Sequence, residues 1–265
     1  MKTVHFSRKN LRFPYFVYLV LFVVAPLLVL VYYAFTDKNG TLTAANLIDF
    51  FSNPNTLGTL FYSFAVAFVT TCVCLFLAYP VAYILATSHF KAKSVMIMVF
   101  IMPMWINFSL RITALKELLT MIEGNLAYYP FFNAVVGMTY DFLPFMILPI
   151  YNAIVKLDYS LIEAAKDLGA SDVSAFLKVT LPLSVPGIIS GVAMVFLPAM
   201  TNYVVLDMLY NSTYIMGSLI GSYFAAYDWN GGSMIALILL MIICAFTLFT
   251  KDYEEDASAR GGALL

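Results

Sequence analysis

The sequence predicts an all-α integral membrane protein with six transmembrane helices, and three observations support this fold class. Hydrophobic residues make up 62% of the 265 residues and charged residues only 11%. Soluble proteins are about 45–50% apolar and about 25% charged, so a soluble fold could not bury this much apolar surface. The apolar residues also form long runs. The basic residues concentrate in every second segment between these runs, as expected if those segments lie on one side of a membrane.

A helix needs about 20 apolar residues to cross a hydrocarbon layer of about 30 Å. The runs place the spans near residues 13–35, 57–87, 95–113, 131–154, 187–206 and 233–250. The second run is too long for one straight span, and Pro80 predicts a kink or an interfacial end there. The first run is longer than the apolar region of a secretory signal, and we interpret it as a retained helix.

The orientation follows from the distribution of the 14 lysines and arginines. Eleven fall on one predicted side of the membrane and three on the other side or its margins, which predicts that both termini are cytoplasmic. The acids of the opposite, outer segments form a mildly acidic entrance that would attract cations, although solvated loop charges are the simpler explanation. These acids are Asp37, Asp49, Glu117, Glu123, Asp207 and Asp228.

Several function classes are excluded by composition and motifs. The net charge of −1 gives no basic footprint for a nucleic acid. The chain has no G-x-x-x-x-G-K-[ST] loop for nucleotide phosphates, no nucleophile elbow and no H-E-x-x-H helix. Its cysteines, Cys72, Cys74 and Cys244, lie in apolar runs without a neighbouring histidine. We therefore expect no catalytic residues, no metal site and no cofactor in this chain.

The long polar segment 157–187 between the fourth and fifth spans is predicted to form two short helices. Ser160 and Glu163 have the spacing of a capping box, in which each side chain binds an amide of the first turn. Gly169 suits the left-handed residue that ends a helix, and Ser171 or Asp172 can cap the next one. This helix–turn–helix would face the cytoplasm, where it could couple to a motor protein or merely connect two spans as an interfacial hairpin.

The second short helix should run to about Thr180, where Pro182 is expected to stop it. Pro182 is also the last residue of a longer sequence pattern that begins at Glu163. Glu163-Ala164-Ala165, Gly169, Val179 and Leu181-Pro182 resemble, in identity and spacing, the EAA loop of inner-membrane permeases of binding-protein-dependent ABC importers. The family pattern has isoleucine in place of Val179, a conservative difference.

This resemblance implies a type I ABC importer permease fold with a cytoplasmic coupling helix between helices 4 and 5. The residues that would couple to the ATPase are Glu163, Ala164, Ala165, Gly169, Leu181 and Pro182. It also implies a domain layout: a cytoplasmic N-terminus (1–12), a first transmembrane helix with an outer loop (13–56), a permease core (57–250) and a disordered cytoplasmic tail (251–265).

Within that family, several stretches are similar to the spermidine/putrescine permeases. They are residues 78–83, 102–107 with 109–112, 143–146 and 197–200. The similarity implies a subunit of an ATP-driven polyamine importer in a bacterial inner membrane. It implies as partners a second permease in a heterodimer, an ATPase dimer that binds ATP and Mg²⁺, and an extracytoplasmic polyamine-binding protein.

Asp141 is the sharpest candidate for the substrate path because it lies within the fourth apolar run. An ionised acid at mid-membrane costs about 2.5–3.5 kcal/mol on insertion scales, so it should face a cavity or a partner. The alternative is a structural pairing with Arg111 across helices. Pro103 should open the helix ladder in the third span, just before Trp105 and Asn107.

The outer end of the fifth span offers Tyr203 and Asp207 as a mouth for the path, with an interfacial aromatic belt as the competing explanation of Tyr203. The candidate path residues are thus Asp141, Trp105, Asn107, Arg111, Tyr203 and Asp207.

Two other functions stay open at this point. One is the same type of permease with another small solute, such as an amino acid, iron, sulfate or a sugar. The other is a proton-driven secondary transporter with Asp141 as a proton relay, which would leave the EAA-like loop unexplained.

Overall fold

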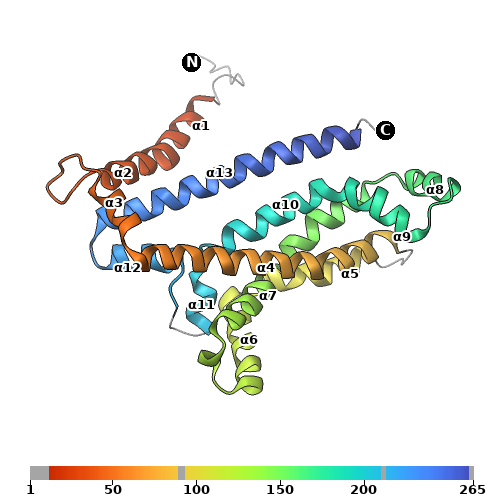
Figure 1. Ribbon diagram of the computed structural model, residues 1–265, viewed down its shortest axis with the longest axis horizontal. Helices are drawn as coiled ribbons and strands as arrows, with labels where there is room; N and C mark the ends of the chain where they lie inside the picture. The colour runs from red at the N-terminus through yellow and green to blue at the C-terminus, as the bar shows by residue number, and fades with distance from the viewer. Residues whose placement is uncertain (1–11, 89–92, 210–212, 263–265) are drawn as a thin grey trace, which may run out of the picture. The chain divides into compact units, whose positions relative to one another are not determined.

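A computed structural model describes residues 12–88, 93–209 and 213–262, and within these residues the regular structure is helical (Figure 1). The chain divides into two compact units. One consists of Met1–Gly58 and Ser218–Ile242, and the other of Thr59–Gly217 and Ile243–Leu265. The predicted all-helical fold class is confirmed, and each unit is described by itself below.

The first unit contains the first apolar helix and the loop that follows it. Its elements are α1 (Arg12–Leu19), the π-helical η1 (Val20–Val24), α2 (Ala25–Ala34), α3 (Ala45–Ser52), most of α12 (Met216–Ala225) and the start of α13 (Trp229–Gly262). Asn230 of α13 links the two sequence segments of this unit. Its side-chain amide donates to the backbone oxygens of Tyr33 at 3.1 Å and Thr36 at 2.7 Å, at the end of α2.

The second unit contains the remaining helices. They are most of α4 (Pro54–Thr87), α5 (Lys93–Ile101), the 3₁₀ turn η2 (Met102–Trp105), α6 (Phe108–Glu123), the 3₁₀ turn η3 (Leu126–Tyr128), α7 (Pro130–Val155), α8 (Tyr159–Asp167), α9 (Asp172–Ala175), the π-helical η4 (Phe176–Thr180), α10 (Leu181–Ala199), α11 (Tyr203–Leu209) and the rest of α13 from Ile243.

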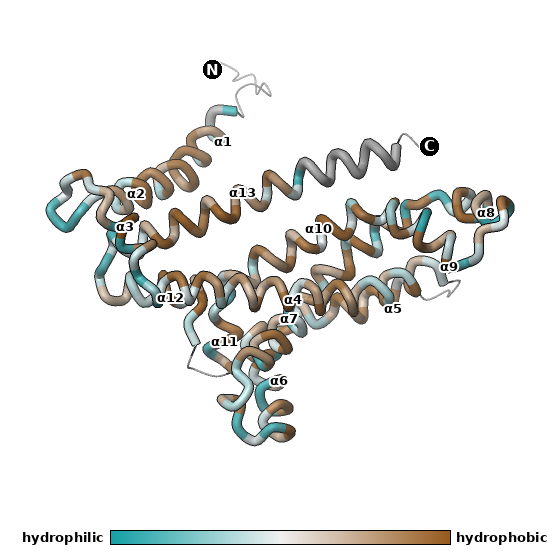
Figure 2. The backbone as a smooth tube through the Cα atoms, in the orientation of Figure 1, coloured by the Kyte–Doolittle hydropathy of each residue, from teal (hydrophilic) through white to brown (hydrophobic). Residues whose placement is uncertain are grey.

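Five helices are long and apolar enough to cross a membrane: Pro14–Ala34, Pro54–Thr87, Pro130–Val155, Asp172–Ala199 and Trp229–Lys251. A sixth span is available if the bent pair Val95–Trp105 and Phe108–Glu123 counts as one. The brown colour of these long helices in Figure 2 shows the same distribution of apolar residues. The first, second, fourth and sixth predicted spans therefore match observed helices.

The predicted third span is wrong as a single straight helix. The chain bends by 95° between Val95–Trp105 and Phe108–Glu123. The cause is local: Pro103 removes a backbone donor, η2 tightens the turn, and Ile106 takes an extended backbone conformation. The helix ladder therefore opens where the sequence predicted it, but the bend is far sharper than a kink.

The predicted limits 187–206 of the fifth span are also wrong, as is the expected stop at Pro182. A single helical run extends from Asp172 to Ala199 and ends before Tyr203. Pro182 is accommodated because η4 precedes it, and the amide of Leu181 reaches back five residues to the oxygen of Phe176. The wider π turn absorbs the proline, and η1 is placed in the same way before Pro26.

The C-terminal segment, predicted to be disordered from residue 251, continues α13 as a helix to Gly262. A helix that is already formed adds each further residue at little cost, and the acidic and alanine residues here are adequate helix formers. The predicted N-terminal segment 1–12 lies, apart from Arg12, outside the described residues.

Helices α7 and α10 pack against each other along their length and form the core of the second unit (Figure 1). Two glycines four residues apart allow this approach. A methyl group on Gly187 would lie 2.7 Å from the carbonyl oxygen of Pro149, and one on Gly191 would lie 2.7 Å from the sulfur of Met146. Close backbone contact through small residues is the usual way in which helices associate in membranes.

Candidate functional site

The segment after α7 begins with a capped helix, although the cap is not the one that the sequence predicted. Asp158 is the N-cap of α8, and its carboxylate accepts a hydrogen bond of 3.0 Å from the amide of Ser160. Ser160 is therefore inside the helix, and the predicted capping box with Glu163 does not form. An acid is the better cap because its charge also interacts with the helix dipole. The same hydrogen bond lowers the pKa of Asp158 below its ordinary value of 3.8.

Gly169 ends α8 as predicted. Its φ is +88°, in the left-handed region. Its amide donates to the oxygen of Lys166 at 2.8 Å, and the amide of Ala170 donates to Ala165 at 3.0 Å. These two hydrogen bonds form a Schellman motif, which satisfies the last carbonyls of the helix. A Cβ here would contact nothing within 4 Å, so backbone conformation alone requires glycine.

The second short helix is fixed to the first by side chains. Ser171 caps α9 through a hydrogen bond of 3.3 Å from the amide of Ser174. Lys166 and Asp172 form an ion pair at 2.7 Å between α8 and α9. The hydrogen bond to Asp172 raises the pKa of Lys166 above its ordinary 10.5. The two helices therefore lie side by side as one small element.

The surface of this element is open. Glu163, Ala164 and Gly169 are exposed, and Ala165 is half-buried. Leu168, at the tip, is 91% exposed. Small residues beside a fully exposed leucine form a surface on which another protein can approach the backbone closely.

The remaining two predicted coupling residues, Leu181 and Pro182, start α10 instead of lying on this surface. They join the exposed element to the long helix behind it. The predicted set is thus divided between an exposed surface and the first turn of a long apolar helix.

Helix α4 packs against η4 and the start of α10, the segments that follow α9. The rings of Tyr79 and Tyr83 meet the ring of Phe176 edge-on, at centroid distances of 5.8 and 5.1 Å. The hydroxyls of Tyr79 and Ser184 are 2.9 Å apart, and Ser184 donates its own proton to the oxygen of Leu181 at 2.9 Å. Because serine has one donor, Tyr79 donates to Ser184.

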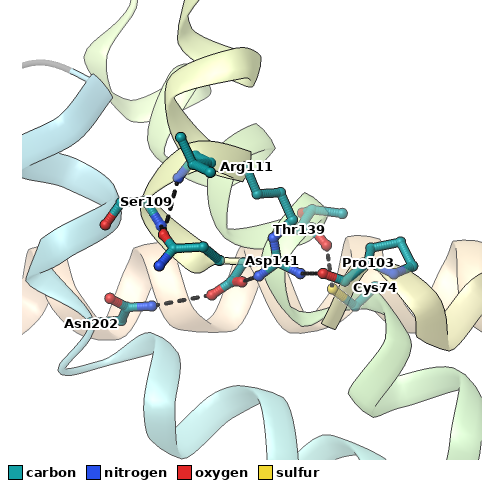
Figure 3. A network of polar contacts seen from close by, with 9 residues as sticks. Cys74, Pro103, Ser109, Arg111, Thr139, Asp141 and Asn202 are labelled. Atoms are coloured by element: carbon teal, nitrogen blue, oxygen red, sulfur yellow. Dashed lines mark hydrogen bonds and ion pairs between the residues drawn. The ribbon is translucent and has the colours of Figure 1, made fainter. Parts of the chain in front are cut away.

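The second unit also contains a buried polar centre, which lies where the bent span meets α7 (Figure 3). Arg111 of α6 and Asp141 of α7 form an ion pair, and they are 7% and 5% exposed. Arg111 also donates to the oxygen of Pro103 at 3.1 Å. Asn202, in the turn after α10, donates to the other carboxylate oxygen of Asp141 at 3.3 Å.

This centre contains the structural pairing that the sequence offered as the alternative for Asp141. It joins four segments, namely η2, α6, α7 and the turn after α10. The carbonyl of Pro103, which already accepts from the amide of Ile106 at 3.2 Å, is also part of the centre. The aromatic face of Tyr140 lies 5.6 Å from the guanidinium carbon of Arg111 and adds a cation–π contact.

The other predicted path residues do not join this centre. The side chain of Asn107 caps α6 by accepting from the amides of Ser109 at 3.0 Å and Leu110 at 3.4 Å. Trp105 is 81% exposed at the bend. Tyr203 and Asp207 are both exposed, and since they are four residues apart in α11 they share one face.

The sequence between residues 11 and 251 matches the model of a protein family described as "Binding-protein-dependent transport system inner membrane component". The chain belongs to this family. This membership removes the support for a secondary transporter. The exposed element of α8 and α9 carries the first part of the EAA-like pattern of this permease, from Glu163 to Gly169.

Several similar proteins match this permease over nearly its whole length. It is 32% identical to the spermidine/putrescine transport system permease protein PotB of Haemophilus influenzae, over 89% of this chain and 91% of that one. It is also 32% identical to PotB of Escherichia coli K12, over 85% and 90%. A crystal structure of a bacterial alginate ABC transporter, in complex with an alginate-bound periplasmic protein, contains a chain with a TM-score of 0.72. That chain is 11% identical, with 91% of each chain covered, and shows the shared fold.

Three features of the permease site were not predicted from the sequence. The pair Gly187 and Gly191 was visible as G-x-x-x-G in an apolar run, which is a known signal of helix packing. Leu168 gave no signal, because an exposed leucine looks like any other apolar residue in a helix. Asn202 gave none either, since its partner Asp141 is 61 residues away.

Proposed function

We propose that this permease is one transmembrane subunit of an ATP-driven importer of polyamines, with spermidine and putrescine as its cargo. The observation that carries the proposal is the 32% identity to a spermidine/putrescine permease over nine-tenths of both chains. The acidic outer segments suit a cationic solute better than an anionic one.

The proposed assembly contains a second permease as a heterodimer partner, an ATPase dimer that binds ATP and Mg²⁺, and an extracytoplasmic polyamine-binding protein. It resides in a bacterial inner membrane with both termini of this chain in the cytoplasm. This chain supplies the path and the coupling surface, and the partner ATPase supplies the hydrolysis.

The proposed mechanism starts at the exposed element. Glu163, Ala164 and Leu168 contact the ATPase, and closure of the ATPase dimer on ATP moves α8 and α9. The continuous run from Asp172 to Ala199 transmits this movement into the membrane, because η4 joins α9 to α10 without a break.

The next steps follow the packing inside the second unit. Gly187 and Gly191 hold α10 against α7, and Asp141 of α7 holds Arg111 and the bent span. Rigid movement of α10 would therefore tilt α7 and shift the bend, which changes access to the path from one side to the other. Trp105, Tyr203 and Asp207 are the exposed candidates for cargo contact along that path.

Uptake of radiolabelled spermidine and putrescine tests this proposal, in cells that lack their own polyamine importers and carry the complete operon of this chain. We expect ATP-dependent uptake of a polyamine, and its loss in Gly169→Asp at an unchanged membrane level. Uptake of sulfate, sugars and amino acids serves as the control. An operon that restores one of these and no polyamine would refute the cargo and keep the permease.

A further inference from the structure

A polar cavity of about 390 Å³ lies within the first unit, in segments that the coupling element and the Arg111 centre do not use. It is bounded by α3, the first turn of α4, α12 and the start of α13. Its polar lining includes Asp49, Asn53, Thr56, Tyr223 and Asp228. By the predicted topology it opens on the outer side of the membrane.

The two carboxylates of the cavity are available for a cation. Neither Asp49 nor Asp228 has an ion-pair partner within the part of the chain that the structure describes. One oxygen of Asp228 accepts a hydrogen bond of 3.0 Å from the amide of Gly231. This bond fixes the carboxylate at the start of α13.

Thr56 is a second and independent sign of a ligand. It lines the cavity and is 3% exposed. Its hydroxyl has no hydrogen-bond partner among residues 12–88, 93–209 and 213–262. The hydroxyl oxygen is accessible from the cavity, so a ligand there can donate a proton to it.

The chemistry of the lining selects the class of cation. Within the described ranges no three His, Cys, Asp or Glu side chains gather as a metal site would require. An ammonium group has three donors, which two carboxylates and a hydroxyl can accept. Phe50 and Ile235, buried apolar residues of the same lining, suit the methylene chain behind it. We propose that this cavity binds a primary alkylammonium group.

Such a group has two sources here: one end of a free polyamine, or a lysine of the extracytoplasmic binding protein. The proposal deepens the proposed function, on which the choice of these probes rests. The decisive variants are Asp49→Asn and Asp228→Asn, which keep size and capping ability and remove one charge each. Asp37→Asn is the matched control, because Asp37 lies in the outer loop of the same unit but outside the cavity.

Two measurements on the assembled transporter in nanodiscs distinguish the sources. One is binding of radiolabelled spermidine without binding protein or ATP. The other is the concentration of binding protein that gives half-maximal stimulation of ATP hydrolysis. n-Butylamine, which carries the same head group and is no cargo of the proposed importer, is titrated in parallel, so that a wrong cargo and a wrong cavity give different results.

We expect the affinity for the true ligand to fall about tenfold in each cavity variant, as for the loss of one charge-assisted hydrogen bond, and to stay unchanged in Asp37→Asn. Weaker spermidine or n-butylamine binding assigns the cavity to a free amine. Unchanged amine binding with a higher requirement for binding protein assigns it to a lysine of that protein. No change in either measurement, or an equal change in Asp37→Asn, overturns the proposal.

Discussion

The guanidinium of Arg111 on α6 pairs with the carboxylate of Asp141 on α7, and both side chains are almost completely buried. The pair closes the gap that the bend at Pro103 opens, since Arg111 also binds the carbonyl of Pro103. A membrane offers no polar partners at this bend of 95°, so contacts within the protein must hold its two arms together. The charged pair therefore stabilises the broken span.

Removal of one partner should be far more damaging than removal of both. Arg111→Met leaves the buried charge of Asp141 unpaired, which costs about 3–5 kcal/mol. The double variant Arg111→Met/Asp141→Leu should recover a large part of that loss. Thermal unfolding of the purified complex measures this. Equal losses in the single and double variants would show that the pair does not stabilise the bend.

Gly169→Ala should uncouple the permease while leaving it folded in the membrane. A left-handed φ of +88° costs an L-residue about 1–2 kcal/mol, so the turn between α8 and α9 should rearrange. The ratio of polyamine uptake to ATP hydrolysis is the measurement. Gly58→Ala is the matched control, because Gly58 lies in α4 with open space around its Cβ position and no positive φ. A normal ratio in Gly169→Ala would contradict this role of the turn.

The sequence predicted the features that depend on nearby residues. Run length placed four of the six spans, and the left-handed turn at Gly169 followed from its position after a short amphipathic helix. The Arg111–Asp141 pairing was foreseen as an alternative, because a buried acid and a buried base in neighbouring spans have few other partners.

Features set by packing were beyond the sequence. Pro182 has the same signature as a helix-terminating proline, and only the π turn from Phe176 to Thr180 lets the helix pass. Asp158 and Ser160 are both good caps, and the choice between them depends on where α7 ends. The size of the bend after Pro103 depends on Asn107 starting a new helix in a different direction.

Acid should loosen the start of α8, and the sign follows from the pKa of Asp158. That pKa is lowered in the folded protein by the hydrogen bond from Ser160, so the cap is fully effective above about 3.8, the ordinary value. Its contribution is lost as the pH falls from 3.8 through the lowered pKa. Hydrogen exchange of the amides of α8, measured between pH 5 and the acid limit of the complex, should show this loss.

Asp158→Asn provides the control for that titration, since asparagine can accept the same capping hydrogen bond and does not titrate. The pH dependence of exchange in α8 should then disappear, while the exchange at pH 5 stays near that of the unchanged chain. If the variant keeps the same acid transition, another group is responsible for it.

The close backbone approach between α7 and α10 should make Gly187 more sensitive to substitution than either Gly191 or Gly221. A Cβ there would lie 2.7 Å from the carbonyl oxygen of Pro149, and backbone cannot move aside as a side chain can. Gly191→Ala should be milder, because its short contact is with the flexible end of Met146. Gly221→Ala, with nothing within 4 Å, should be neutral. Membrane levels and thermal unfolding of the three variants should follow that order, because the two helices must separate in proportion to the rigidity of the atom that the new methyl group meets.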